Sequence, residues 1–133
     1  MRFRTLEEAA KMSGWHMEAY QFILESLQRT LKEQHAARGP KTRRKHITAQ
    51  ELLKGVVTHA ADRFGYLAPT VFSQWGVRRS EDVGSMVFQM IDLKLLKKNR
   101  SDKQSDFDSA MDLQSALQEA SQHAFDRVSD PNS

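Results

Sequence analysis

The sequence predicts an all-α, mainly helical fold that forms one compact helical domain. Along most of the chain, apolar residues recur at intervals of three and four positions, which is the periodicity of an amphipathic helix. A threonine followed three positions later by a glutamate, a pattern that caps helix starts, occurs at Thr5 and again at Thr48. The 133 residues match the length of one domain. We expect the domain to span residues 1–128 and residues 129–133 to fray.

The first two predicted helices span about residues 5–13 and 15–36. The second is the longer, and polar residues lie opposite its apolar face. That face carries Tyr20, Ile23, Leu24, Leu27 and Leu31. The helix should end before Gly39-Pro40, because proline disfavours helical geometry in the residue that precedes it.

A third helix is predicted over about residues 48–64. Thr48 and Glu51 form a capping box at its start, and Gly65 suits the left-handed residue that closes a helix. Gly55 lies inside this helix, where glycine costs about 1 kcal/mol relative to alanine. We therefore expect a neighbouring helix to approach closely at Gly55.

Two further helices are predicted over about residues 69–75 and 80–93. Pro69 suits the first turn of the shorter one, and Gly76 ends it. Ser80 is the expected N-cap of the longer one. The spacing of its apolar residues predicts a buried face made of Val83, Met86, Val87, Met90 and Ile91.

The pattern after this helix is less regular. Leu95-Leu96 followed by KKNRSDK resembles a strand that leaves the core and turns, which allows one small β-hairpin. Its return strand would be the polar segment SDKQSDF, which has weak strand propensity. A last helix is predicted over about residues 105–128, with a break near residues 109–112.

Composition excludes several classes of protein. The chain has no cysteine, which excludes disulfides, thiolate catalysis and cysteine-ligated zinc. Its first residues, MRFRTLEEAAK, contain two glutamates where a signal peptide needs an apolar run, and no segment approaches membrane-spanning length. We therefore expect a cytoplasmic protein with no membrane partner.

The charges are unevenly distributed although the net charge is only +3. Segments 38–46 and 94–103 are basic, and the chain is acidic after Gln104. One interpretation is that these segments are solvated or face each other; the other is a polyanion-binding surface. In the second, the candidate phosphate-contacting residues are Arg43, Arg44, Lys45, Arg78, Arg79, Lys97, Lys98 and Arg100.

The order of elements over residues 48–100 resembles a winged helix-turn-helix, with the helix from Ser80 in the recognition position and KKNRSDK as the wing. This resemblance implies a fold and not a function. The face that would meet DNA carries Glu81, Asp82, Ser85, Gln89 and Asp92. Because groove binding depends on cations that neutralise phosphates, this acidic face argues against DNA recognition.

Three segments, HITAQELLKG, ADRFGYLAPTVFSQWGV and EDVGSMVFQMI, resemble an uncharacterised family of small proteins of planctomycetes and verrucomicrobia. The resemblance extends from about Tyr20 to Leu113. Val83 stands where that family has a phenylalanine. The resemblance implies a bacterial protein with a shared fold, and it implies no chemistry.

No motif predicts an active site. None of the five histidines has a partner histidine four residues away, the helical spacing that converges on a metal. His59, three residues before Asp62, is the best candidate ligand or base, but a helix-surface histidine is the favoured interpretation. DKQSDFDSAMD lacks the glycine and glutamate of a calcium loop. We expect no enzyme, no cofactor, no metal and no small-molecule substrate.

The favoured function is a non-enzymatic protein-interaction module on a winged-helix-like scaffold. Its candidate interface consists of Trp15, Met17 and Tyr20, and its partner is an unidentified protein or a second copy of the chain. The alternative is a nucleic-acid-binding or ribonucleoprotein accessory factor that contacts phosphates through segments 38–46 and 94–103.

Overall fold

The structure is a computed structural model that describes residues 5–38, 47–97 and 103–129, with side chains over residues 5–36, 47–97 and 103–123. These residues form helices and no strand, which confirms the all-α prediction for this part of the chain. The α-helices are α1 Leu6–Ser13, α2 Met17–Arg38, α3 Ala49–Phe64, α4 Ala68–Trp75, α5 Ser80–Asp92 and α6 Leu113–Ser129. Two 3₁₀ turns join them, η1 Gly65–Leu67 and η2 Gln104–Phe107.

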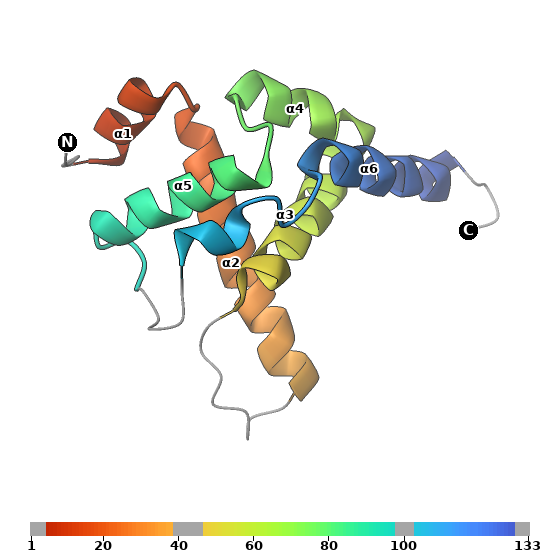
Figure 1. Cartoon of the computed structure of the whole chain (residues 1–133). Coiled ribbons are helices and arrows are strands. Elements are labelled where there is room, and N and C mark those ends of the chain that lie inside the picture. Colours follow the sequence, from red (N-terminus) through yellow and green to blue (C-terminus); the bar gives the residue numbers. More distant parts are fainter. Residues whose placement is uncertain (1–4, 39–46, 98–102, 130–133) are drawn as a thin grey trace.

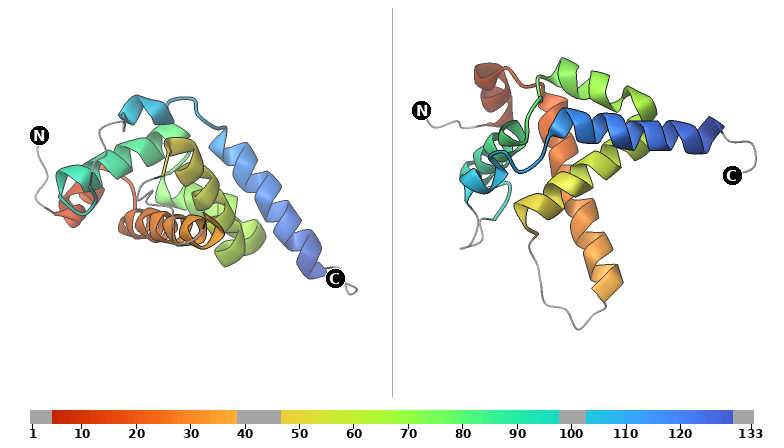
Figure 2. Two further views of the ribbon diagram at one scale, coloured as in Figure 1. Left: turned by 90° about the horizontal axis from the view of Figure 1, so that it is seen from below. Right: turned by 45° about the vertical axis from the view of Figure 1, so that its right-hand side comes forward.

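Helices α2 and α3 form the centre of the fold (Figure 1). Helix α6 packs against α3, η1 and α4, while α5 packs against η2 and α2. Figure 2 shows that α6 and α5 lie on opposite sides of α3, so the two ends of the molecule are built by different helices. This arrangement leaves the carboxyl end of α5 far from α6.

One hydrophobic cluster joins the α-helices and η2. Met86 and Met90 are fully buried, as their spacing predicted. An aromatic group lies where α2, α3 and α4 meet, with ring centroids 5.4 to 5.8 Å apart. It consists of Phe22, Phe64, Phe72 and Trp75.

The predicted close approach at Gly55 is confirmed. A Cβ atom at this position would overlap Thr30 Oγ1 of α2 and lie 3.2 Å from Thr30 Cβ. The Thr30 hydroxyl cannot simply turn away, because it donates a hydrogen bond of 2.7 Å to the Ser26 carbonyl. Glycine is therefore required where α2 and α3 cross.

The predicted helix ends are largely confirmed. The Thr48–Glu51 capping box is present, and Gly76 closes α4 in the left-handed conformation with φ 83°. Gly65 also has positive φ, at 58°, but its ψ of −139° lies outside the left-handed helical region. The prediction for Gly65 was therefore right about glycine and wrong about the conformation, because the chain continues directly into η1 instead of closing a Schellman turn.

Ser80 is not the N-cap of α5. It is the first helical residue, its side chain is fully buried, and its hydroxyl donates a hydrogen bond of 2.6 Å to the Phe107 carbonyl. The capping role belongs to Asp82, whose carboxylate accepts hydrogen bonds from Arg78 N at 2.9 Å and Arg79 N at 3.0 Å. The serine is occupied by a tertiary contact that local sequence does not reveal.

The predicted hairpin is not confirmed. Residues 93–97 and 103–107 contain no strand, and Gln104–Phe107, the expected return strand, is the 3₁₀ turn η2. Phe107 is buried against Gly84, where a Cβ atom would lie 2.6 Å from Phe107 Cβ. The gain from burying this aromatic ring explains why the polar segment turns instead of extending.

The last helix starts later than predicted. Instead of running from residue 105, α6 begins at Leu113, where the Asp112 carboxylate accepts a hydrogen bond of 3.2 Å from Ser115 N. Ser109 has φ 52°, which prevents the helix from continuing through it. The expected break is therefore a complete separation between η2 and α6. No helix in the described ranges is both long and apolar enough to cross a membrane.

Candidate functional site

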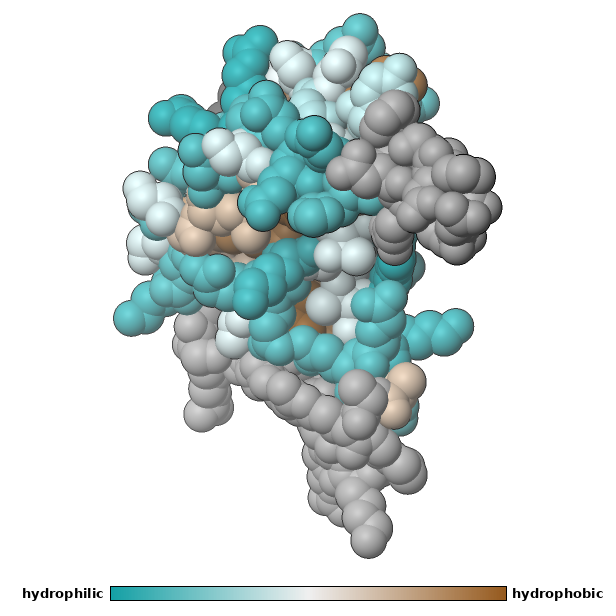
Figure 3. Space-filling model, turned by 90° about the vertical axis from the view of Figure 1, so that its right-hand side faces the viewer, coloured by the Kyte–Doolittle hydropathy of each residue, from teal (hydrophilic) through white to brown (hydrophobic). Residues whose placement is uncertain are grey.

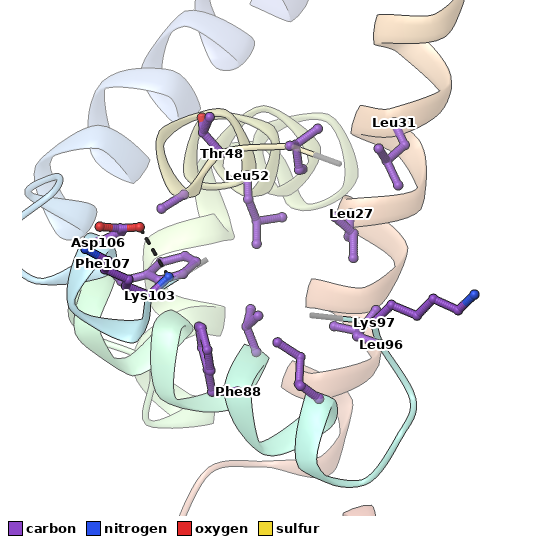
Figure 4. A pocket seen from close by; sticks show the side chains of 14 residues that line it. Leu27, Leu31, Thr48, Leu52, Phe88, Leu96, Lys97, Lys103, Asp106 and Phe107 are labelled. Atoms are coloured by element: carbon purple, nitrogen blue, oxygen red, sulfur yellow. Dashed lines mark hydrogen bonds between the residues drawn. The ribbon is translucent and has the colours of Figure 1, made fainter. Parts of the chain in front are cut away.

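An apolar groove of about 200 Å³ lies between α2, α3, α5 and η2 (Figure 4). Leu27 and Leu31 of α2 form one wall, Leu52 of α3 forms its base, and Phe88 of α5 lies opposite. The lining also includes Ile47, Ala49, Val87, Ile91, Leu96 and Phe107, with Thr48, Lys97, Lys103 and Asp106 as its polar members. Such a concave and predominantly apolar site is typical of ligand and partner binding.

The polar members lie at the groove's edge. Lys97 is exposed, and its side chain extends outward from the groove into solvent (Figure 4). The Asp106 carboxylate accepts a hydrogen bond of 3.3 Å from Lys103 N, and this bond stabilises the start of η2. The lining therefore contains two lysines, Lys97 and Lys103, and one carboxylate, which gives the groove's edge a formal charge of +1.

Sequence periodicity predicted apolar helix faces that include Leu27, Leu31, Val87 and Ile91. It did not predict that these residues line a groove. Leu27 and Leu31 follow the apolar stripe of α2, yet both remain partly exposed in the structure. Both leucines lie beside Thr30, where α2 approaches α3 most closely, and the contact of α2 with α3 continues past them to Gln34 and Glu51. Their side chains line the groove beside this contact, a position that sequence periodicity does not distinguish from the contact itself.

The predicted interface of Trp15, Met17 and Tyr20 is only partly at the surface. Tyr20 is fully buried, and its hydroxyl donates a hydrogen bond of 2.5 Å to Gln89 of α5. Its inclusion in a surface patch was therefore wrong, because this hydrogen bond allows the phenol to be buried in the core. Trp15 and Met17 are half-buried, and the exposed methionine nearby is Met12, at 64%.

The candidate phosphate-contacting residues do not form one surface in the described part of the chain. Arg78, Arg79 and Lys97 are exposed, whereas Arg43, Arg44, Lys45, Lys98 and Arg100 lie outside the described residues. Arg79 precedes α5 and Lys97 follows it, and this helix is about 20 Å long at 1.5 Å per residue. The three exposed cations therefore flank opposite ends of α5.

Helix α5 does not present a free recognition face. Asp92 is its only exposed residue, and every other position is buried or half-buried. Ser85 accepts a hydrogen bond of 3.2 Å from Gln104 of η2, and Gln89 is held by Tyr20. The polar face that was predicted to meet DNA is thus partly used to attach η2 and α2.

His59 pairs with a serine rather than with Asp62. Its Nδ1 lies 2.8 Å from Ser26 Oγ, and its ring stacks on Phe22 at a centroid distance of 4.3 Å. Because the Ser26 hydroxyl donates its one proton to the Phe22 carbonyl at 2.8 Å, His59 Nδ1 acts as the donor to Ser26. Burial lowers the pKa of His59, and the Arg29 guanidinium lowers it further.

This serine–histidine pair is unsuited to nucleophilic catalysis. The Ser26 side chain is fully buried, so a substrate cannot reach its oxygen. Asp62, the expected partner of His59, forms an ion pair with Arg29 instead. Both contacts join α2 to α3, which gives the histidine a structural explanation. No group of three metal-ligating side chains occurs among the residues with described positions.

Another pocket lies beside α6, but three of its five lining residues are polar, since it consists of Tyr66, Pro69, Gln118, Ser121 and Gln122. Figure 3 shows that hydrophilic side chains predominate there and that the hydrophobic areas are small and separate. Large exposed apolar patches mark interaction sites, and scattered ones do not. The groove is therefore the better candidate.

Comparison of the chain with protein-family models, curated proteins and solved structures finds no match. The resemblance to the planctomycete and verrucomicrobial family therefore stays a prediction.

Proposed function

We propose that this chain is a non-enzymatic protein-interaction module that binds its partner in the groove between α2, α3 and α5. The observation that carries the proposal is the apolar lining, in which partly exposed Leu27, Leu31 and Phe88 face one another across an open space. Covering these side chains would remove apolar area from water at about 25 cal/mol per Å².

The proposed occupant is an amphipathic helix of a partner protein with acidic residues beside its apolar face. A helix places apolar side chains at intervals of three and four, which suits a groove between helices. Lys97 and Lys103 line the groove's edge and favour carboxylates on the partner. We propose that this module has a winged-helix-like scaffold, because α3, α4 and α5 follow one another in the order of a helix-turn-helix.

The proposal is tested by selecting helix-forming peptides from a display library against the full chain. We expect selected peptides to carry apolar residues at helical spacing with acidic residues beside them. Leu31→Glu, which places a charge in the groove, should weaken their binding at least about tenfold. Leu95→Glu is the matched control, because Leu95 is 48% exposed and does not line the groove. Binders that tolerate Leu31→Glu as well as Leu95→Glu contradict the proposal.

The alternative function is a nucleic-acid-binding accessory factor, and one observation favours keeping it. Helix α6, which carries Glu119 of the acidic segment, packs on α3, η1 and α4, so only Asp106 of η2 lines the same groove as Lys97 among the described acids after Gln104. Arg78, Arg79 and Lys97 make no ion pair with any residue in the described ranges. These exposed cations remain available to phosphates.

Fluorescence anisotropy with random duplex DNA and with single-stranded RNA distinguishes the two functions. The nucleic-acid function requires binding that weakens steeply with salt and is lost when Arg43, Arg44 and Lys45 are neutralised together. The protein-interaction function predicts no binding even at low salt. Binding that survives the triple substitution would exclude segment 38–46 as the contact.

A further inference from the structure

A further pocket, of about 380 Å³, lies on another face of the molecule between α2, α3 and α4. Its aromatic side is formed by Phe22, Phe64 and Trp75, and its edge carries Glu18 and Glu25. At about 100° per residue, these glutamates lie on the face of α2 opposite to Leu27 and Leu31. The pocket is therefore separate from the groove.

Arg63 shows which chemistry this pocket accommodates. Its guanidinium carbon lies 5.9 Å from the centroid of Phe22 and 5.7 Å from that of Phe64. The same guanidinium forms an ion pair of 2.8 Å with Glu25. Aromatic faces and a carboxylate together are the environment that a guanidinium prefers. The side chain of Arg63 is nevertheless 53% exposed, so the pocket remains open beside it.

The pocket has more polar groups than Arg63 uses. Glu18, Gln21 and Gln74 line it, and within the described residues their side chains make no hydrogen bond or ion pair. Together, Glu18, Glu25 and Arg63 give the pocket a formal charge of −1, which attracts a cation. A second guanidinium would enter beside the 8% of Trp75 that is exposed, with the Glu18 carboxylate and the side-chain oxygens of Gln21 and Gln74 as hydrogen-bond acceptors.

We propose that this pocket binds the guanidinium of an arginine side chain from another molecule, with Arg63 as a competing internal cation. The site would take arginine in preference to a neutral side chain of the same shape, because both its carboxylates and its aromatic faces act on the charge. This inference goes beyond the proposed function and does not depend on the groove.

The test uses N-acetyl-arginine methylamide and N-acetyl-citrulline methylamide, which have nearly the same shape and differ in side-chain charge. Binding to the full chain is followed by NMR through the indole N–H signals of its two tryptophans. We expect the arginine compound to shift the Trp75 signal in a saturable manner that weakens with salt. The citrulline compound should produce no saturable shift.

Single substitutions test how much each side chain contributes to binding of the arginine compound. Arg63→Ala removes the competing cation and should tighten binding of the arginine compound about fivefold. Glu18→Gln should weaken it by a similar factor. Glu33→Gln is the matched control, because Glu33 has the same charge on the same helix but pairs with Arg29 and does not line the pocket. It should leave the binding unchanged.

Two results would overturn the proposal. One is an equal shift of Trp75 by the arginine and citrulline compounds, which would show that charge plays no part. The other is the absence of a saturable shift in both the wild-type chain and Arg63→Ala, with the fold of the variant verified by circular dichroism.

Discussion

At the scale of single residues, Gly55 decides how closely α2 and α3 approach. A methyl group here would overlap the Thr30 hydroxyl, which is fixed by its hydrogen bond to the Ser26 carbonyl. We predict that Gly55→Ala lowers the free energy of unfolding by about 1–3 kcal/mol, because overpacking outweighs the gain of about 1 kcal/mol in helix propensity. Urea denaturation followed by circular dichroism measures this change.

Two further variants identify the cause. Thr30→Ala removes the overlapping oxygen, so Gly55→Ala should cost much less in that background. Thr58→Ala, at an exposed position of the same helix, should not destabilise the chain. An equal cost of Gly55→Ala with and without the Thr30 hydroxyl would show that this contact is not responsible.

His59 makes stability depend on pH. Its ring extends from α3 and packs against α2. The charges of Arg29 and Arg63 disfavour the protonated ring, and the charges of Glu25 and Asp62 favour it. Burial has the largest effect and lowers the pKa of the folded state below the ordinary value of 6.5. The neutral ring therefore contributes stability above about pH 6.5, and this contribution is lost as pH falls through the lower pKa of the folded state.

We predict that the loss of unfolding free energy between about pH 7.5 and about pH 5 is smaller in His59→Asn than in the wild-type chain. Asparagine keeps a donor for Ser26 Oγ and does not titrate. Urea denaturation at both pH values measures the difference. If the variant and the wild-type chain lose the same free energy, His59 is not the titrating group.

At the scale of elements, α5 is stabilised at its start by a carboxylate. Asp82 accepts two backbone hydrogen bonds there and lies near the positive end of the helix dipole. We predict that Asp82→Ala lowers the free energy of unfolding by about 1–2 kcal/mol. Thermal or urea unfolding measures this change.

Asp92→Ala provides the control within the same helix. Asp92 is exposed at the carboxyl end of α5, where a negative charge meets the negative end of the dipole. Its removal should be neutral or slightly stabilising. Equal destabilisation by both substitutions would mean that the caps and the dipole do not explain the position of these acids.

At the scale of the whole molecule, we predict that the chain is a monomer in sedimentation equilibrium. None of its large exposed apolar residues in the described ranges, Met12, Tyr66, Leu67 and Leu95, lines the groove. The groove is lined by 14 residues, fewer than the roughly 20–30 that each partner contributes to a stable interface. A dimer that Leu31→Glu dissociates would contradict the prediction and make a second copy the occupant of the groove.

How far the sequence predicted this molecule can be judged from particular residues. The Thr48–Glu51 capping box and the glycine of Gly76 were predicted because their hydrogen bonds and dihedral angles involve residues a few positions apart. Ser80 was predicted wrongly, since its hydrogen bond reaches Phe107, 27 positions away. Tyr20 was assigned to a surface for the same reason, because its partner Gln89 is 69 positions away.

The sequence by itself determined that the described chain is helical, where most helices start and end, and which methionines are buried. Periodicity and capping are local, so they can be read from neighbouring residues. Only the tertiary structure decided that Leu27 and Leu31 stay uncovered, that α5 has no free face, and that Arg63 lies over two aromatic rings. These features depend on how helices distant in sequence pack against one another, and that geometry is set by contacts such as Gly55 with Thr30.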